Sequence, residues 1–411
     1  MDNSELITMF IFRKIKEQLH FIFSTPVNFF YCLIWGFCLV GYWRGINNHI
    51  PLLGNVTDEM EIAFVVIPLI ASLGHIVRRM DVKDWITLFL FYFVYFINYI
   101  LFPENEEYLT ERLYSCIVLT IPYFIIGTTL DIEKFLETFF YISVVSILMC
   151  AFYELSYLQS ASYVGDIDVE EYNMTASYSM LQHVILVSWF ALKDMKLWRL
   201  IVMVIGLLLL FAFGTRGPLV CIILFIVIYL LFLRPSKYTK IFKVIVIAMS
   251  VLAFYSLDAV MIFLQIVILN MGMSTRIFDK YFTEELGVVD SRDAIIEKLM
   301  NVMQSDNQIL GHGLLGSYKY VGTYPHRIWV EFVFSFGWIL GCILLALLAI
   351  LIIKAFCKSK SNDDKTFLIL LVCGSIVKLF FSSTFLDDTL FFLLIGCCYR
   401  LLKYNTKVVS I

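Results

Sequence analysis

Long apolar runs, separated by short polar segments, follow one another along most of the chain. A helix needs about 20 apolar residues to cross a lipid bilayer, which is the length of most of these runs. The runs are continuous rather than alternating, which excludes a transmembrane β-barrel. The pattern therefore predicts an all-α polytopic membrane protein with about twelve transmembrane helices. The predicted spans lie near residues 27–44, 61–77, 85–102, 112–130, 135–156, 176–192, 197–213, 217–233, 243–263, 328–353, 366–383 and 385–402.

The composition supports the same class of protein. Hydrophobic residues make up 60% of the chain and charged residues 16%, and the mean hydropathy is +0.84. Soluble globular domains have about 25% charged residues. The composition therefore excludes a soluble enzyme, a disordered protein and a fibrous protein.

The basic residues indicate which ends of the spans face the cytoplasm. With both chain ends in the cytoplasm, about two thirds of the 31 Lys and Arg residues fall on that side, as the positive-inside rule requires. One outer segment, residues 271–327 between spans 9 and 10, is much longer than the others, and long loops are usually functional. The sequence thus predicts spans 1–9 within residues 1–270, a large outer loop over 271–327, and spans 10–12 within residues 328–411.

One basic residue breaks this rule at the outer end of span 8. Arg216 lies in the segment Gly214-Thr215-Arg216-Gly217-Pro218, at a helix start, where the helix dipole disfavours a cation. Thr215 is a candidate cap, and Pro218 suits a first helical turn. A bound anion would remove the cost of the cation, because a helix start and a guanidinium together form a good oxyanion site. The alternative is an interfacial arginine that binds lipid headgroups.

The long outer loop repeats this arrangement. The segment Asp290-Ser291-Arg292-Asp293 is typical of a helix start, with Asp290 or Ser291 as the cap, so Arg292 again lies in a first turn. The alternative is a surface arginine paired with a neighbouring aspartate. An apolar stripe follows, which is more typical of packing against the bundle or the membrane interface than of a cofactor site. Its members are Ile296, Leu299, Met300 and Met303.

A third group, Tyr324-Pro325-His326-Arg327, directly precedes span 10. A histidine at this position can titrate near neutral pH or donate a hydrogen bond to a phosphate, and Pro325 restrains the turn that aims it. Glu331, one turn into span 10, is placed to orient His326. The alternative is an interfacial histidine without a chemical role.

Two ionisable residues lie inside predicted spans. Lys378 in span 11 needs a partner, for which Asp387 or Asp388 is a candidate. Whether Lys378 is structural or lines a substrate path stays open at this point. His183 in span 6 is predicted to be a satisfied core histidine.

Taken in order, these segments resemble the motifs of the O-antigen polymerase and O-antigen ligase superfamily. Residues 214–218 resemble its Ser/Thr-Arg-Gly motif, and residues 291–293 with 309–313 resemble its loop, in which an arginine opens a helix and a Leu-Gly-x-Gly turn follows. Tyr324-Pro325-His326, followed by Glu331, resembles its Pro-His-Asn segment. Arg327 stands where an asparagine is usual in that segment.

The resemblance implies a GT-C-like glycosyltransferase of the bacterial inner (cytoplasmic) membrane, with both termini cytoplasmic and a periplasmic active site. Polymerases of this superfamily join oligosaccharide repeat units carried on undecaprenyl diphosphate, without a metal or other cofactor. The expected partners are these lipid-linked oligosaccharides, membrane lipids and a chain-length regulator protein, with no nucleic acid. The expected site residues are His326, Arg216 and Arg292 for catalysis, Arg216, Arg292, Thr215 and Arg327 for binding the diphosphate, and Tyr324 and Glu331 as supporting residues.

The residues themselves suit this chemistry. Charge develops on the departing diphosphate while the sugar passes through an oxocarbenium-like state, and preplaced cations stabilise that charge. Arg216 and Arg292 can each offer a planar, bidentate fork to phosphate. His326 can accept the proton of the attacking hydroxyl or bind the diphosphate, and the sequence leaves both roles open.

Three other functions compete with the polymerase. A ligase that transfers the finished glycan to lipid A core shares the same motifs. A lipid-linked-oligosaccharide flippase would need a charged central cavity and symmetrical halves, and the sequence shows no repeated halves. Another GT-C enzyme that uses polyprenyl-phosphate sugars would leave the two arginine motifs unexplained.

Overall fold

The computed structural model describes residues 3–39, 58–114, 116–117, 120–161, 174–213, 215–233, 291–305 and 310–407, with a few positions between 262 and 269. The regular elements of this described part are all helices, and it contains no strand. Four of its helices are long and apolar enough to cross a membrane: Val82–Leu101, Ile132–Tyr153, Arg216–Leu233 and Ile328–Lys358. The all-α fold is thereby confirmed. The twelve-span layout and the outer position of the long loop stay predictions, and span 243–263 lies outside the described residues except at its last two positions.

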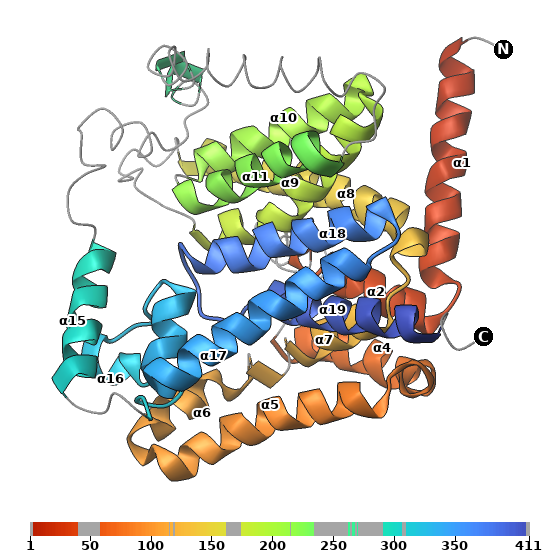
Figure 1. Ribbon diagram of the computed structural model, residues 1–411. Helices are drawn as coiled ribbons and strands as arrows, with labels where there is room; N and C mark the ends of the chain where they lie inside the picture. Colours follow the sequence, from red (N-terminus) through yellow and green to blue (C-terminus); the bar gives the residue numbers. More distant parts are fainter. Residues whose placement is uncertain are drawn as a thin grey trace.

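Most helices of the described part pack side by side into one bundle, and α1 runs across one end of it (Figure 1). The elements are α1 (Asn3–Phe23), α2 (Pro26–Trp35), α4 (Asp58–Arg79), α5 (Val82–Leu101), η1 (Pro103–Asn105), α6 (Glu106–Tyr114), α7 (Thr120–Thr129), α8 (Ile132–Ala161), α9 (Met174–Asp194), α10 (Leu197–Ala212), α11 (Arg216–Ile228), η3 (Tyr229–Leu233), α15 (Ser291–Ser305), α16 (Ser317–Val321), α17 (Ile328–Lys358), α18 (Asn362–Val372), η4 (Cys373–Val377) and α19 (Thr389–Lys407).

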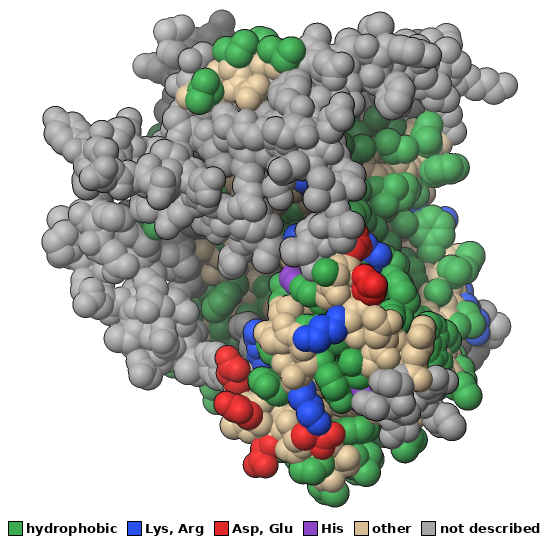
Figure 2. Space-filling model, turned by 90° about the vertical axis from the view of Figure 1, so that its left-hand side faces the viewer, with side chains coloured by type: hydrophobic (Ala, Val, Ile, Leu, Met, Phe, Trp, Pro, Cys, Tyr) green, Lys and Arg blue, Asp and Glu red, His purple; other side chains and the backbone are tan. Residues whose placement is uncertain are grey.

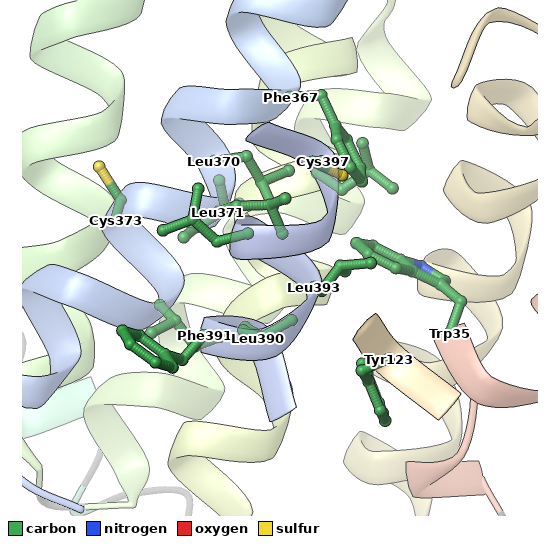
Figure 3. Packing of buried hydrophobic residues seen from close by; sticks show 14 of the residues in the cluster. Trp35, Tyr123, Phe367, Leu370, Leu371, Cys373, Leu390, Phe391, Leu393 and Cys397 are labelled. Carbon is green, nitrogen blue, oxygen red and sulfur yellow. The ribbon is translucent and has the colours of Figure 1, made fainter. Parts of the chain in front are cut away.

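The centre of the bundle depends on a close crossing of α7 and α19. A Cβ atom on Gly127 would lie 2.5 Å from the carbonyl oxygen of Leu393, and one on Gly396 would lie 2.4 Å from that of Phe124. Small residues allow helix backbones to approach in this way within membranes. Large apolar side chains fill the space around the crossing, and Figure 3 shows several of them: Trp35, Tyr123, Phe367, Leu370 and Phe391.

Apolar side chains also cover the outside of the bundle. Phe89 and Ile100 on α5, and Ile339 and Ile353 on α17, are each more than 60% exposed. Soluble proteins rarely expose contiguous apolar surfaces of this kind. On helices of this length, the exposed apolar surface is what contact with lipid requires.

The helix predicted as span 10 is broken near its start. Gly337 has φ 81° and ψ 166° inside the otherwise helical α17. A Cβ atom on Gly341 would lie 2.7 Å from the carbonyl oxygen of Phe332, so the part before the break folds back against the part after it. The part before the break is buried and the part after it is mostly exposed. The expectation of one continuous span over 328–353 is corrected here, because an apolar pattern does not reveal a break that a positive-φ glycine permits.

The loop before α17 pairs the backbone groups that this break releases. His312 and Gly313 donate backbone hydrogen bonds to the carbonyls of Phe334 and Ser335, at 2.8 and 3.0 Å. On its other side, the amide of Asn105 donates to the carbonyl of His312 at 2.8 Å. Buried backbone groups outside a regular helix need partners within the protein of this kind.

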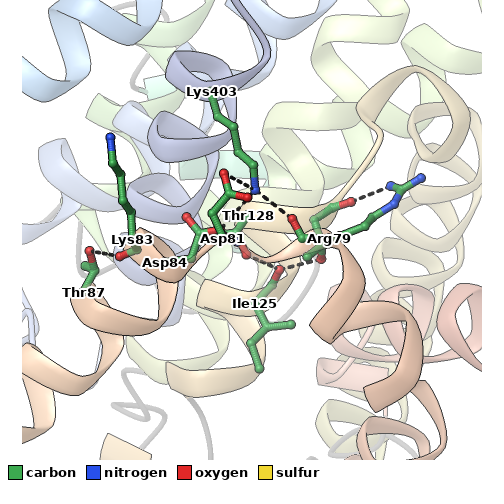
Figure 4. Close-up of polar contacts among 9 residues, drawn as sticks. Arg79, Asp81, Lys83, Asp84, Thr87, Ile125, Thr128 and Lys403 are labelled. Carbon is green, nitrogen blue, oxygen red and sulfur yellow. Dashed lines mark hydrogen bonds and ion pairs between the residues drawn. The ribbon is translucent and has the colours of Figure 1, made fainter. Parts of the chain in front are cut away.

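Ion pairs at one end of the bundle join segments that are predicted to be cytoplasmic. The Lys403 ammonium in α19 lies 2.9 Å from the carboxylate of Asp81 and 3.5 Å from that of Asp84, and it donates to the carbonyl of Arg79 at 2.7 Å (Figure 4). Arg79 in turn donates to the carbonyl of Thr129 at 2.8 Å. Segments assigned to the same side by their basic residues thus lie at the same end of the bundle.

The core histidine is confirmed. His183 in α9 is fully buried. Its Nδ1 lies 3.0 Å from the hydroxyl of Ser143, and its Nε2 lies 3.1 Å from the sulfur of Cys38. Ser143 also accepts a hydrogen bond from the indole of Trp35 at 3.0 Å, so the network joins α2, α8 and α9.

Candidate functional site

The start of α11 carries the first predicted arginine motif, of which Gly214 lies outside the described residues. Arg216 is the first residue of the helix and is exposed, and no ion pair joins it to another described residue. Thr215 is buried at the N-cap position, but its hydroxyl bonds to the hydroxyl of Ser177 instead of a backbone amide. The expected side-chain cap is therefore not formed, and Thr215 ties the helix start to α9.

Gly217 allows two large side chains to approach the first turn of α11. A Cβ atom at this position would lie 2.1 Å from the Tyr178 hydroxyl and 3.1 Å from the Cβ of Phe381. The first of these distances is too short for any real side chain, so a larger residue here would have to displace the Tyr178 hydroxyl. Phe381 thus contacts α11 one residue after Arg216.

Helix α15 brings the second predicted arginine to the same phenylalanine. Nη1 of Arg292 donates a hydrogen bond to the carbonyl oxygen of Phe381 at 2.7 Å. The predicted apolar stripe holds α15 in place, because Leu299 and Met303 are fully buried in a cluster with the buried first part of α17. Phe381 therefore contacts both Arg292 and the first turn of α11 at Gly217. Asp290, one of the two predicted caps of α15, lies outside the described residues.

The third predicted group is joined to α15 by an ion pair. Nη2 of Arg327, the N-cap residue of α17, lies 2.6 Å from the carboxylate of Asp293. Both side chains are substantially exposed, so the pair contributes only about 0–1 kcal/mol to the free energy of unfolding. Its main effect is to orient the Arg327 guanidinium towards α15. His326 has φ 59°, which is uncommon for a residue other than glycine, and its ring lies 4.3 Å from that of Tyr324. Arg292 directly precedes Asp293 in the sequence, and His326 directly precedes Arg327. The ion pair therefore brings the backbone of these two predicted site residues towards each other.

Residues 380–388, which carry Phe381, are fixed from further sides. Glu331 in the buried part of α17 accepts hydrogen bonds from the Thr384 hydroxyl and, at 3.3 Å, from the amide of Phe385. The structure therefore gives Glu331 partners in this segment, whereas the sequence led us to expect that it orients His326.

Lys378 holds the same segment from within the bundle. Its ammonium lies 2.6 Å from Oδ2 of Asp388, and the side chains of the pair are 15% and 0% exposed. Asp388 Oδ1 also accepts the backbone amide of Phe391 at 2.8 Å, which caps α19. The Lys378 ammonium lies 5.4 Å from the ring centre of Tyr178, the residue that packs on Gly217. Asp388 is thereby identified as the partner of Lys378, one of the two predicted candidates.

Sequence reasoning missed Arg112, which holds the segment from α6. Its guanidinium lies 2.8 Å from the carboxylate of Asp387 and donates to the Tyr318 hydroxyl at 3.1 Å. The available signal was the adjacent pair Asp387-Asp388 beside an apolar span, because two carboxylates there require two cationic partners.

Figure 2 faces this end of the molecule and shows basic and acidic side chains gathered on it, with apolar side chains on the flank. Among the described residues, no group of three or more His, Cys, Asp or Glu side chains is arranged to hold a metal ion. The arrangement instead combines a helix start with guanidinium groups, which together can bind an oxyanion.

No family model matches the chain, and no curated protein or solved structure matches it either. The described part is all-helical, includes helices able to cross a membrane, and brings together segments of three predicted arginine and histidine motifs at one end.

Proposed function

We propose that this protein is a polymerase of surface polysaccharide that joins undecaprenyl-diphosphate-linked oligosaccharide repeat units. One observation carries the proposal: Phe381 contacts both Arg292, through its backbone carbonyl, and Gly217, the residue after Arg216. Two arginines that are 76 positions apart in the sequence are thereby tied to one short segment. A diphosphate carries adjacent anionic groups, which suits two guanidinium forks better than one.

In the proposed reaction, a hydroxyl oxygen of the acceptor sugar attacks the anomeric carbon of the donor glycan. The new bond is the glycosidic C–O bond, and the bond that breaks joins the anomeric carbon to the lipid diphosphate. Arg216 and Arg292 stabilise the charge that the leaving diphosphate gains. His326 takes the proton of the attacking hydroxyl, and Tyr324 packs beside its ring. Because the donor is already activated by its diphosphate, the reaction needs no metal or nucleotide.

The proposal places the protein in the bacterial inner membrane with about twelve spans, cytoplasmic ends and a periplasmic site. The distribution of ion pairs supports the grouping of these segments into two opposite sides, while the orientation itself rests on the basic residues. Arg112–Asp387 and Arg327–Asp293 join segments assigned to the outside. Arg400–Asp364 and Lys193–Asp363 join segments assigned to the cytoplasm, as does the Lys403 cluster of Figure 4.

The test is an in vitro assay of the purified full chain with lipid-diphosphate repeat units, without added metal or nucleotide. The proposal expects a ladder of polymer and release of the lipid diphosphate. Absence of polymer from a correctly folded protein given its own repeat unit would contradict it. In cells, loss of a polymerase leaves lipopolysaccharide with a single repeat, whereas loss of a ligase leaves bare core, so the same deletion strain separates these two functions.

A further inference from the structure

Helix α1 lies at the end of the bundle opposite the candidate site and crosses it instead of running along it (Figure 1). One side of α1 faces the first turns of α8. Lys14 lies 3.0 Å from the carboxylate of Glu137, and Gln18 accepts a hydrogen bond from the Thr138 hydroxyl at 2.7 Å. The ring centre of Phe21 lies 5.1 Å from that of Phe135.

A second side of α1 is apolar and exposed. Phe12, Ile15, Leu19 and Phe23 are 68%, 50%, 48% and 67% exposed. Their spacing of three and four residues places them in one stripe along the helix. All four side chains are far more exposed than those of the core, although the ring of Phe23 also stacks on that of Phe29.

The third side of α1 is polar. Arg13, Lys16, Glu17 and His20 are all exposed, and at helical spacing they lie between the apolar stripe and the side that faces α8. Glu17 pairs with Arg13 at 3.0 Å. Hydrogen bonding to Glu137 raises the pKa of Lys14, an ammonium that is charged at neutral pH even without this contact. On this polar side Arg13 and Lys16 stand against Glu17, which leaves a net positive charge.

We infer that α1 lies flat in the headgroup layer of the membrane leaflet opposite the candidate site, with its apolar stripe in the lipid and its cations at anionic lipid phosphates. A helix that runs across the ends of membrane-crossing helices lies in the membrane plane. An apolar side next to a cationic side is the arrangement of interfacial helices. The inference goes beyond the proposed function and does not depend on it.

The decisive experiment is photo-crosslinking of the full chain in nanodiscs that contain equal parts of phosphatidylglycerol and phosphatidylcholine. The photoreactive residue p-benzoyl-phenylalanine replaces Phe12, Leu19 or Phe23 in the stripe, and Arg13 or His20 on the polar side. Phe21 is the matched control, because it lies on the same helix but packs on Phe135. We expect lipid adducts at the stripe positions, at least about fivefold fewer at the polar positions, and a crosslink within the chain at position 21.

The same experiment tests the second part of the inference. The ratio of phosphatidylglycerol to phosphatidylcholine adducts at position 12 is expected to exceed the ratio in the nanodisc. Lys16→Gln is expected to lower that enrichment, by up to roughly fivefold for one cation near an anionic surface. Equal lipid labelling of both sides, or crosslinks from the stripe to a second copy of the protein, would overturn the membrane placement. An adduct ratio equal to that of the nanodisc would overturn the role of the cations.

Discussion

Arg292 in α15 donates a hydrogen bond to the backbone carbonyl of Phe381, which lies 89 residues further along the chain. Because the acceptor is a backbone carbonyl, the contact depends on the path of residues 380–388 and not on the side chain of Phe381. That path is held by Glu331 in α17, by Arg112 in α6 and by Lys378, which directly follows η4. The position of the Arg292 guanidinium therefore depends on these three contacts as well as on α15.

Replacing Arg216 with lysine is expected to lower polymerisation about 100-fold, because the ammonium keeps the charge but lacks the bidentate fork. The measurement is the rate of polymer formation by purified protein in the in vitro assay. Arg13→Lys, an exposed arginine at the other end of the molecule, is the matched control and should leave the rate unchanged. A near-normal glycan ladder from normally expressed Arg216→Lys protein would show that the fork is not needed.

Gly217→Ala is expected to displace the start of α11, because the added Cβ would meet the Tyr178 hydroxyl. Overpacking of this kind costs about 1–3 kcal/mol, and a small displacement of Arg216 should lower the rate roughly 10- to 100-fold. Tyr178→Phe removes the clashing oxygen, so the double variant should recover much of the lost activity. The comparison of both single variants with the double variant, in rate and in thermal unfolding, checks this coupling. If Gly217→Ala alone is fully active, the close packing at this turn is not required.

The sequence predicted those parts of the fold that follow from local pattern and from the need to pair charges. The stripe through Leu299 and Met303 identified a helix that packs on the bundle, and it is buried as expected. A lysine inside a predicted span, Lys378, indicated a nearby carboxylate, and Asp388 is that partner.

Features that depend on contacts between distant segments were not predictable in this way. The break at Gly337 follows from a backbone conformation that many glycines can adopt but few do. The bond of Glu331 to Thr384 and the ion pair of Arg112 with Asp387 each join residues more than 50 positions apart. The hydrophobic pattern within one segment carries no information about which distant segment it contacts. Such pairs can therefore be identified only from the folded structure.

His326→Asn distinguishes the two roles proposed for this histidine. An asparagine can still donate a hydrogen bond to phosphate, but it cannot take up a proton. If His326 is the general base, the variant should lose about 10²–10⁴-fold in rate, with little change in the apparent affinity for the donor. The measurement is the dependence of the initial rate on donor concentration. A raised KM with an unchanged kcat would instead assign His326 to binding of the diphosphate.

The ion pair of Lys378 with Asp388 allows the effect of Lys378 on the stability of the fold to be separated from an effect on the substrate. Lys378→Gln leaves the Asp388 carboxylate buried without its cation, which should cost about 3–5 kcal/mol of unfolding free energy. Asp388→Asn keeps an oxygen that can accept the amide of Phe391 and therefore retains the cap of α19. The double variant Lys378→Gln/Asp388→Asn should then recover most of the lost stability, because neither side chain is charged. Thermal unfolding of the three variants in detergent measures this recovery. If the double variant regains stability but stays inactive, the lysine acts on the substrate itself; if activity returns with stability, Lys378 acts by holding residues 380–388 against Arg292.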